Sequence, residues 1–137
     1  KSNTWGRAMT SLRETGRRIL GEVLGADYLA KRDASTTDFN APIREFSETA
    51  AFGMLWSRPG LERKTRSLLC LAMLTALNRP NELRMHLMSA LNNGCSVEEI
   101  QEALLHTVGY CGIPATRDAF EVAEAFLTER GLLSGDE

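Results

Sequence analysis

The sequence lacks the features that identify several large classes of protein. Its 16 basic and 18 acidic side chains give a net charge of −2, so no excess of positive charge is available for nucleic acid. Its three cysteines, Cys70, Cys95 and Cys111, form no close pair, which argues against a disulfide scaffold or a zinc ribbon. The longest apolar run, residues 68–77, is too short to cross a bilayer, and no signal peptide is visible. These absences predict a small, soluble, cytoplasmic protein.

The motifs of cofactor-dependent and nucleophilic enzymes are missing as well. The sequence has no glycine-rich phosphate loop, no G-x-S-x-G turn and no pair of histidines at metal-binding spacing. Its two histidines, His86 and His106, fall on different predicted helices, without a cysteine or carboxylate pattern typical of a ligand set. An enzyme with this sequence is therefore expected to work without a metal or a bound cofactor.

Helical periodicity, in contrast, runs through almost the whole chain, and no segment alternates as a strand would. The 137 residues are enough for a single domain, residues 1–137, with a hydrophobic core. We expect an all-α fold of about six helices, at about residues 5–24, 38–56, 62–77, 80–93, 96–110 and 115–130. The polar residues 31–37 are expected to form a loop.

Local signals place several of these boundaries. Asp38 is a candidate N-cap for the second helix, and the turn at residues 58–60, which contains Pro59, ends it. Ser96 and Glu99 have the spacing of a capping box at the start of the fifth helix. The third helix is apolar on every side over residues 68–77, more than a domain of this size can enclose. One side is therefore expected to pack against a second copy of the chain, in a homo-oligomer.

His86 is the first candidate for chemistry. It lies at the edge of the apolar stripe of the fourth helix, and Glu82 lies one turn before it on the same side. A neighbouring carboxylate orients an imidazole and raises its pKa, as is required of a general acid or base near neutral pH. The alternative is a histidine at a helix–helix contact whose ring only completes a hydrogen bond.

Other side chains are candidates for binding an acidic substrate. Trp56 and Arg58 lie at a rigid turn, and an arginine can hold a carboxylate through two hydrogen bonds; the alternative is an ordinary turn with a surface arginine. Arg66 is a similar candidate, although a solvated helix start or an interface ion pair is the simpler interpretation. His106 and Tyr110 are four residues apart, opposite an apolar stripe, and either face solvent or line a cleft between subunits.

Four motifs between residues 56 and 115 occur together: W-S-R-P-G-L, E-L-x-x-H, N-N-G and Y-x-G-x-P. In this combination the segment resembles the 4-carboxymuconolactone decarboxylases of aromatic catabolism, with a weaker match upstream at residues 23–25 and 38–40. The resemblance implies an all-α bundle of the alkylhydroperoxidase D-like superfamily, assembled as a homo-trimer or homo-hexamer, that needs no cofactor.

The same resemblance separates this chain from the redox branch of the superfamily, which carries a C-x-x-C-x-x-x-H motif. Arg79 and Glu82 stand where that branch has its two cysteines, and His86 stands at its histidine. The resemblance further implies that His86 donates a proton, with Glu82 as its partner, and that Arg58 and Trp56 contact the substrate. His106 and Tyr110 match further family positions and are expected to complete the pocket.

Two positions depart from the family pattern. Met54 replaces an acidic residue before the W-S-R-P-G-L motif, and Leu20 replaces an arginine five residues before Gly25. Both polar side chains have become apolar, at positions expected to contact the substrate. The change favours a divergent member whose substrate is larger and less charged, such as an aromatic or polyketide-derived acid or lactone. The alternative is that both positions tolerate change and that the family activity persists.

Three functions follow from these observations. The first is a cofactor-independent decarboxylase of a carboxylate conjugated to a lactone carbonyl, followed by protonation of the resulting dienolate. The second is a biosynthetic relative in secondary metabolism that cyclises, rearranges or opens a ring by using His86. The third is a binding or interaction protein with the same fold and no catalysis.

Overall fold

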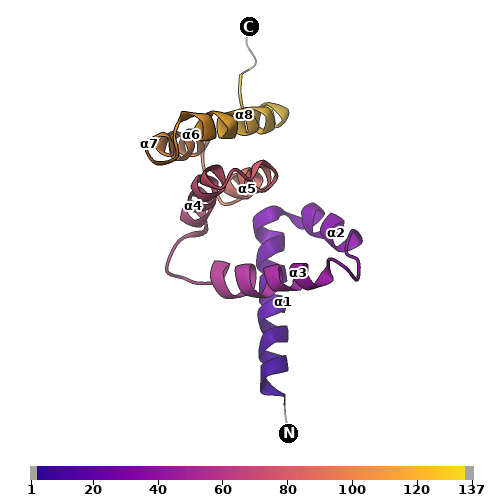
Figure 1. The fold of residues 1–137 in the computed structure, drawn as a ribbon. Coiled ribbons are helices and arrows are strands. Elements are labelled where there is room, and N and C mark those ends of the chain that lie inside the picture. Colours follow the sequence, from indigo (N-terminus) through magenta and orange to yellow (C-terminus); the bar gives the residue numbers. More distant parts are fainter. Residues whose placement is uncertain (1–2, 135–137) are drawn as a thin grey trace. The chain divides into compact units, whose positions relative to one another are not determined.

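The computed structural model describes residues 3–134, and its contacts divide the chain into two compact units, Lys1–Glu62 (unit 1) and Arg63–Glu137 (unit 2). Helices build both units, and the described residues contain no strand (Figure 1), which confirms the predicted all-α fold. No helix among residues 3–134 is long and apolar enough to cross a membrane. The single-domain organisation stays a prediction.

Unit 1 is built around the crossing of a long helix and a shorter one. Its elements are α1 (Thr4–Leu24), α2 (Ala26–Ala34), α3 (Ala41–Phe46) and η1 (Ser47–Trp56). The apolar face of α1 is buried through Ile19, Leu20 and Val23, and η1 crosses α1 (Figure 1). Phe52 and Trp56 of η1 are buried as well, with their rings stacked at 5.9 Å.

Two sequence-based expectations for unit 1 were wrong, and a third was right about the helix but not about its geometry. Residues 31–34 are not loop, because α2 extends to Ala34; their polar side chains take part in ion pairs, which hydrophobic periodicity does not detect. Asp38 does not cap a helix: the turn at residues 37–40 is closed by Thr37 and Asn40, whose side chains each accept a hydrogen bond from the backbone of the other. The segment 47–56 is helical as expected, but it has the wider π-helical geometry.

The backbones of α1 and η1 touch at two glycines. A Cβ atom at Gly16 would overlap the carbonyl group of Glu48 and lie 2.8 Å from the nitrogen of Gly53, and a Cβ atom at Gly53 would overlap the carbonyl oxygen of Leu12. Neither neighbour is a flexible side chain that can turn aside. The crossing therefore requires glycine at both positions.

Gly16→Ala is expected to destabilise unit 1 by about 2–3 kcal/mol, because overpacking forces the backbone to move. Urea unfolding followed by tryptophan fluorescence measures the effect, since Trp5 and Trp56, the two tryptophans of the chain, both lie in unit 1. Gly21→Ala is the matched control on the same helix: its Cβ meets only the end of the Leu29 side chain, at 3.3 Å, and alanine has the higher helix propensity. Equal stability of the Gly16 and Gly21 variants would contradict the close crossing.

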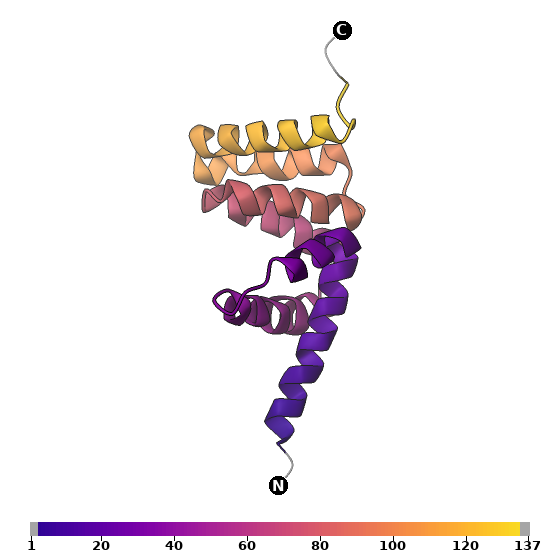
Figure 2. The same cartoon turned by 90° about the vertical axis from the view of Figure 1, so that its right-hand side faces the viewer.

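Unit 2 is a bundle whose helices pack in two layers, α4 with α5 and α6 with α8 (Figure 2). Its elements are α4 (Arg63–Ala76), α5 (Pro80–Asn92), α6 (Val97–His106), α7 (Val108–Cys111) and α8 (Ile113–Glu129). The core between them is contributed by every long helix and includes Leu71, Leu83, Leu87, Ile100, Leu104 and Phe126. The predicted capping box is confirmed, since Ser96 Oγ accepts from Glu99 N at 3.0 Å and Glu99 Oε1 from Ser96 N at 3.1 Å.

The fifth predicted helix does not continue to Tyr110. It ends at His106, and α7 begins after Thr107, whose hydroxyl bonds to the carbonyl of Leu104 and to the hydroxyl of Thr116 at 2.7 Å. Both threonines are buried, so this bond ties the break to the start of α8. The sequence does not indicate this break, because Val108 continues the apolar stripe of Ile100 and Leu104 at four-residue spacing.

Helix α4 has apolar side chains on both its inner and its outer face, and Leu68, Leu71 and Leu74 pack in the core of unit 2. Its buried residues are Ser67, Leu71 and Thr75, two of them polar, and the hydroxyl of Ser67 lies 3.3 Å from that of Ser89 on α5. Three apolar residues at four-residue spacing, Leu69, Met73 and Leu77, are exposed instead, the last of them just after the end of α4. The predicted inner face is therefore present, and a second apolar face is exposed in the protomer; that this face packs against a second copy stays a prediction.

Candidate active site

His86 lies on α5, between the buried face of the helix and its exposed face. Leu83 and Leu87 point into the core of unit 2, while His86 is half-buried and Glu82, one turn earlier, is exposed. The proline at the first helical position and the alternation of apolar and polar residues place α5 against α4 and α8. The four-residue spacing brings the imidazole and the carboxylate to the same side of this helix, as predicted.

The electrostatics of His86 differ from the expectation for a histidine beside a carboxylate. Burial lowers the pKa of the imidazole below its ordinary value, because desolvation disfavours the charged form. Glu82 acts in the opposite direction, but the effect of burial is larger. The ring is therefore predominantly neutral at pH 7, and its protonated form is a strong acid for an imidazolium.

Arg66 lies on α4, a helix that packs directly against α5, so both residues belong to unit 2. It is half-buried, and Cys70 lies one turn farther along the same helix. Burial raises the pKa of the Cys70 thiol, and the charge of Arg66 offsets only part of that effect. Cys70 is thus a protonated thiol at neutral pH, which agrees with its interpretation as a small hydrophobic residue.

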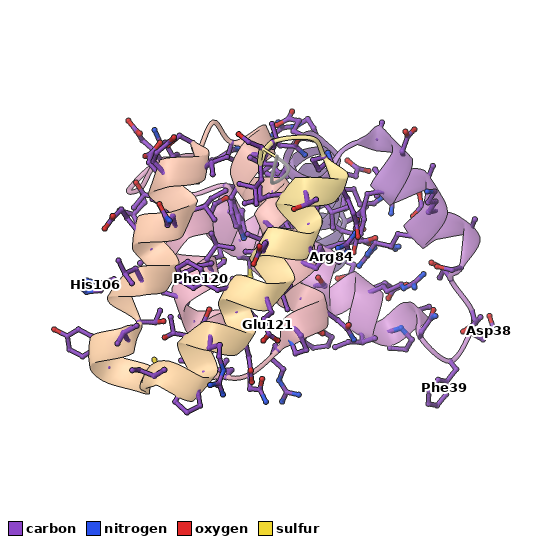
Figure 3. The ribbon with its side chains drawn as sticks, turned by 90° about the horizontal axis from the view of Figure 1, so that it is seen from above. Asp38, Phe39, Arg84, His106, Phe120 and Glu121 are labelled. Atoms are coloured by element: carbon purple, nitrogen blue, oxygen red, sulfur yellow. The ribbon has the colours of Figure 1, made fainter. Side chains whose placement is uncertain are left out.

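His106, at the end of α6, and Tyr110, on α7, contact each other on the surface of unit 2. Their ring centroids are 5.4 Å apart, and Tyr110 is 81% exposed. Figure 3 shows His106 pointing away from α8, at the outer edge of α6. Both rings face outward in the protomer, which agrees with either predicted alternative, a surface in solvent or a cleft between subunits.

The remaining predicted residues lie in unit 1, in three different environments. Leu20 is 1% exposed and packs in the core, and Trp56 is buried against Phe52. Arg58 is exposed in the turn after η1. Met54 is exposed on η1 and lines a pocket of about 450 Å³. The interior of unit 1 thus contains Leu20 and Trp56, and its surface carries Met54 and Arg58.

A group of charged residues in unit 1 was not predicted. Glu48 is 2% exposed, and three arginines from two helices converge on its carboxylate. Arg13 Nε lies 2.7 Å from Glu48 Oε2, while Arg17 Nη1 and Arg32 Nη1 lie 2.8 and 2.7 Å from Oε1. Arg17 also forms two bonds to Asp33, at 2.7 and 3.0 Å. The four-residue spacing of Arg13 and Arg17 was the signal in the sequence that pointed to a shared partner.

The three arginines keep Glu48 ionised. Burial by itself raises the pKa of this carboxyl group, but the hydrogen bonds from Arg13, Arg32 and Arg17 lower it further than burial raises it. The bond from Arg17 likewise lowers the pKa of Asp33. A carboxylate in this state is a poor proton acceptor, so Glu48 holds unit 1 together and orients the guanidinium groups.

Within residues 3–134, no three His, Cys, Asp or Glu side chains gather in an arrangement that could hold a metal ion. The groups that can act chemically are a neutral, half-buried imidazole at His86 and a set of guanidinium groups. An imidazole can exchange a proton with carbon, and a guanidinium stabilises an anion by charge and by two hydrogen bonds.

Comparison with known proteins places this arrangement in context. Residues 42–125 match the model of the carboxymuconolactone decarboxylase family. The 4-carboxymuconolactone decarboxylase of Acinetobacter baylyi is 41% identical over 117 residues, which cover 85% of this chain and 87% of that protein. The nitrosuccinic acid decarboxylase of Metarhizium robertsii is 36% identical over 116 residues, 85% of this chain and 81% of that protein. An uncharacterized 15.0 kDa protein of Paracoccus denitrificans is 37% identical over 81 residues, 57% of this chain and 60% of its own length.

Proposed function

This chain belongs to the carboxymuconolactone decarboxylase family and is an enzyme of the carboxy-lyase class, and from that premise we propose that it removes a carboxylate conjugated to a lactone carbonyl. The observation that carries the proposal is the 41% identity to a 4-carboxymuconolactone decarboxylase over most of both chains. The motif containing Glu82 and His86 lies within the matched segment, residues 42–125.

The chemistry needs an electron sink and one acid. When the bond to the carboxylate breaks, carbon dioxide leaves and the electron pair passes through the double bond onto the carbonyl oxygen, giving a dienolate. Hydrogen-bond donors such as Arg58 or Arg66 stabilise the developing oxyanion. His86 then delivers a proton to carbon, and Glu82 orients the imidazole. The bond to the carboxylate carbon is replaced by a bond to hydrogen, and the reaction as a whole needs no external oxidant or reductant.

The remaining predicted residues have binding roles in this proposal. In unit 1, Trp56 and Arg58 are proposed to contact the substrate; in unit 2, His106 and Tyr110 offer an outward-facing pair of rings for binding it. Met54 is the exposed position at which the family's polar side chain is absent, so it affects which acid is accepted; Leu20, the second such position, is buried in the core of unit 1 and acts through packing.

We also propose that the enzyme is a homo-oligomer, a trimer or a hexamer. Leu69 and Met73 on α4, together with Leu77 just after its end, form an exposed apolar face, and a second copy supplies a matching one. Light scattering of the purified protein tests this directly: a mass of three or six times 15.2 kDa agrees with it, and a mass of 15.2 kDa contradicts it.

A second candidate is favoured by the range of substrates that the relatives' names describe. One relative is named for a lactone acid and the other for a nitro-substituted acid, and each name places a carboxylate in a molecule with an electron-withdrawing group. A divergent member that acts on another such acid, or that rearranges one by using His86, fits the apolar Met54. A protein that only binds such acids is the remaining alternative.

The proposal is tested by incubating the enzyme with 4-carboxymuconolactone and measuring released carbon dioxide. Turnover supports the first candidate. His86-dependent conversion of nitrosuccinic acid, or of an aromatic lactone acid, without turnover of 4-carboxymuconolactone would favour the second. Binding of these acids without conversion of any of them would favour the remaining alternative, a protein that only binds such acids.

A further inference from the structure

Unit 2 has a groove between α6 and α8 that the proposed decarboxylation does not use. It has a volume of about 400 Å³, within the range of roughly 300–1,000 Å³ that small-molecule sites occupy. All of its lining residues belong to unit 2, and His86, Glu82 and Arg66 are not among them. The groove is therefore a second pocket of this unit, separate from its candidate catalytic residues.

The floor and the walls of this groove are apolar. The floor is formed by core residues that are at most 5% exposed: Ile100, Leu104, Ala123 and Leu127. The walls are formed by three half-buried residues, Val97, Phe120 and Leu133. Figure 3 shows Phe120 between α6 and α8. Such a surface fits an apolar body of one or two rings, and the face of an aromatic ring attracts a cation.

Every charged side chain that lines the groove is negative. Glu98 on α6 and Glu124 on α8 line it, both of them exposed, and no lysine or arginine does. Within residues 3–134 neither carboxylate takes part in an ion pair or a hydrogen bond, and Lys64 is paired with Glu99 instead. Glu98 lies in the first turn of α6, where the helix dipole favours a negative charge, but Glu124 lies in the interior of α8. The groove thus combines an apolar surface with two carboxylates that lack a cation.

We propose that this groove binds a small organic cation, an ammonium or guanidinium group attached to an apolar body of one or two rings. The body packs against Phe120 and Leu133 over the buried floor, and Glu98 and Glu124 hold the positive group from the two helices. The carboxylic acids of the proposed function do not fit this site, because its two carboxylates repel a like charge. The inference therefore does not rest on the proposed function, and the failure of one leaves the other standing.

Three probes of similar shape test the charge requirement: 2-naphthylmethylammonium, the uncharged 2-naphthylmethanol and the anion 2-naphthoate. Isoleucine methyl groups are the reporters, since Ile100 is the one isoleucine of the chain that lines the groove. In protein labelled with ¹³C at the isoleucine δ1 methyls, the ammonium probe is expected to shift the signal of Ile100 and to leave those of Ile19, Ile43 and Ile113 in place. The alcohol is expected to bind about tenfold more weakly, and 2-naphthoate more weakly still.

Variants make the test specific to the groove. Glu124→Gln is expected to weaken binding of the ammonium probe about three- to fivefold, the effect of one solvent-exposed ion pair, and to leave binding of the alcohol unchanged. Glu121→Gln is the matched control, since it removes the same charge from an exposed position of α8 outside the groove. Glu98→Gln and Glu102→Gln form the corresponding pair on α6. Sodium chloride at about 0.5 M should weaken binding of the ammonium probe and not that of the alcohol, because salt screens the ion pairs.

Three results would overturn the inference: an unshifted Ile100 signal, equal affinity for the ammonium probe and the alcohol, or equal weakening by Glu124→Gln and Glu121→Gln. A groove covered by another copy of the chain would give the first of these results. The proposed decarboxylation is measured separately, with 4-carboxymuconolactone. Turnover of that acid together with an unshifted Ile100 signal would support the proposed function and reject the cation site.

Discussion

His86→Ala is expected to lower kcat for decarboxylation by at least about 100-fold, because a positioned proton donor or acceptor contributes about 10²–10⁴ to a rate. In the proposed reaction the dienolate must be protonated at carbon, and His86 is a half-buried imidazole within the segment that matches the family. Alanine removes the proton donor and leaves space for water, which protonates the intermediate without orientation. The substrate-binding groups remain, so KM should change much less than kcat.

The pH dependence of kcat is a second test of the role of His86. Burial lowers the pKa of His86 below its ordinary value of about 6.5, so its protonated form is lost as the pH rises through a value on the acidic side of neutrality. If the imidazolium is the proton donor, kcat of the wild-type enzyme decreases as the pH rises through this range. The His86→Ala variant should lack this decrease.

Arg84→Ala is the control on the same helix. Arg84, labelled in Figure 3, is exposed on α5 and pairs with Glu129 of α8, so its loss should leave kcat unchanged. Circular dichroism of both variants checks that the helices are retained. A His86→Ala enzyme that keeps kcat within about threefold of the wild type, with the same pH profile, would exclude His86 as the acid.

Glu48→Gln is expected to destabilise unit 1 by about 3 kcal/mol, the lower end of the cost of removing one partner from a buried ion pair. The amide keeps the shape of the side chain but leaves Arg13, Arg17 and Arg32 facing a neutral group in a site that is 2% exposed. The lower end applies because Arg13 and Arg17 are partly exposed and water screens their charge.

The sign of the pH dependence follows from the lowered pKa of Glu48. Its contribution to stability is fully present above the ordinary pKa of a glutamate, about 4.3, and is lost as the pH falls through the lower pKa of the folded state. The difference in stability between the wild type and Glu48→Gln should therefore be constant from pH 5 to 7 and shrink in stronger acid.

Glu45→Gln is the matched control for this prediction. Glu45 is 53% exposed and lies 3.5 Å from Arg13, so the loss of its charge should cost at most about 0.5 kcal/mol. Urea unfolding followed by tryptophan fluorescence compares the variants in unit 1. Equal stability of Glu48→Gln and Glu45→Gln would show that the buried ion pairs do not stabilise this unit.

Much of the fold was accessible from the sequence because it depends on local signals. The capping box at Ser96, the apolar stripe of α1 and the proline at the start of α5 each act over a few residues. The helix at residues 26–34 was missed because its polar side chains satisfy ion pairs with residues distant in sequence. The π-helical geometry of η1 was missed because it accompanies the glycine contact with α1, which periodicity cannot detect.

The candidate site was predictable in part for the same reason. The four-residue spacing of Glu82 and His86 places both on one side of a helix whatever surrounds it. The direction of the pKa shift of His86 was not predictable, since desolvation depends on how α4 and α8 pack around α5. The buried Glu48 stood in the sequence among apolar and small residues, and only the approach of α1 and α2 identifies its three arginines.

The central claim is that this chain is a decarboxylase that protonates its own intermediate at carbon. The most direct measurement is incubation of the enzyme with 4-carboxymuconolactone in D₂O, with carbon dioxide and the product analysed by mass spectrometry. One carbon dioxide released per product molecule, with one deuterium bound to carbon in that product, is the expected result. An unchanged substrate, or a product that retains every carboxylate, would contradict the claim.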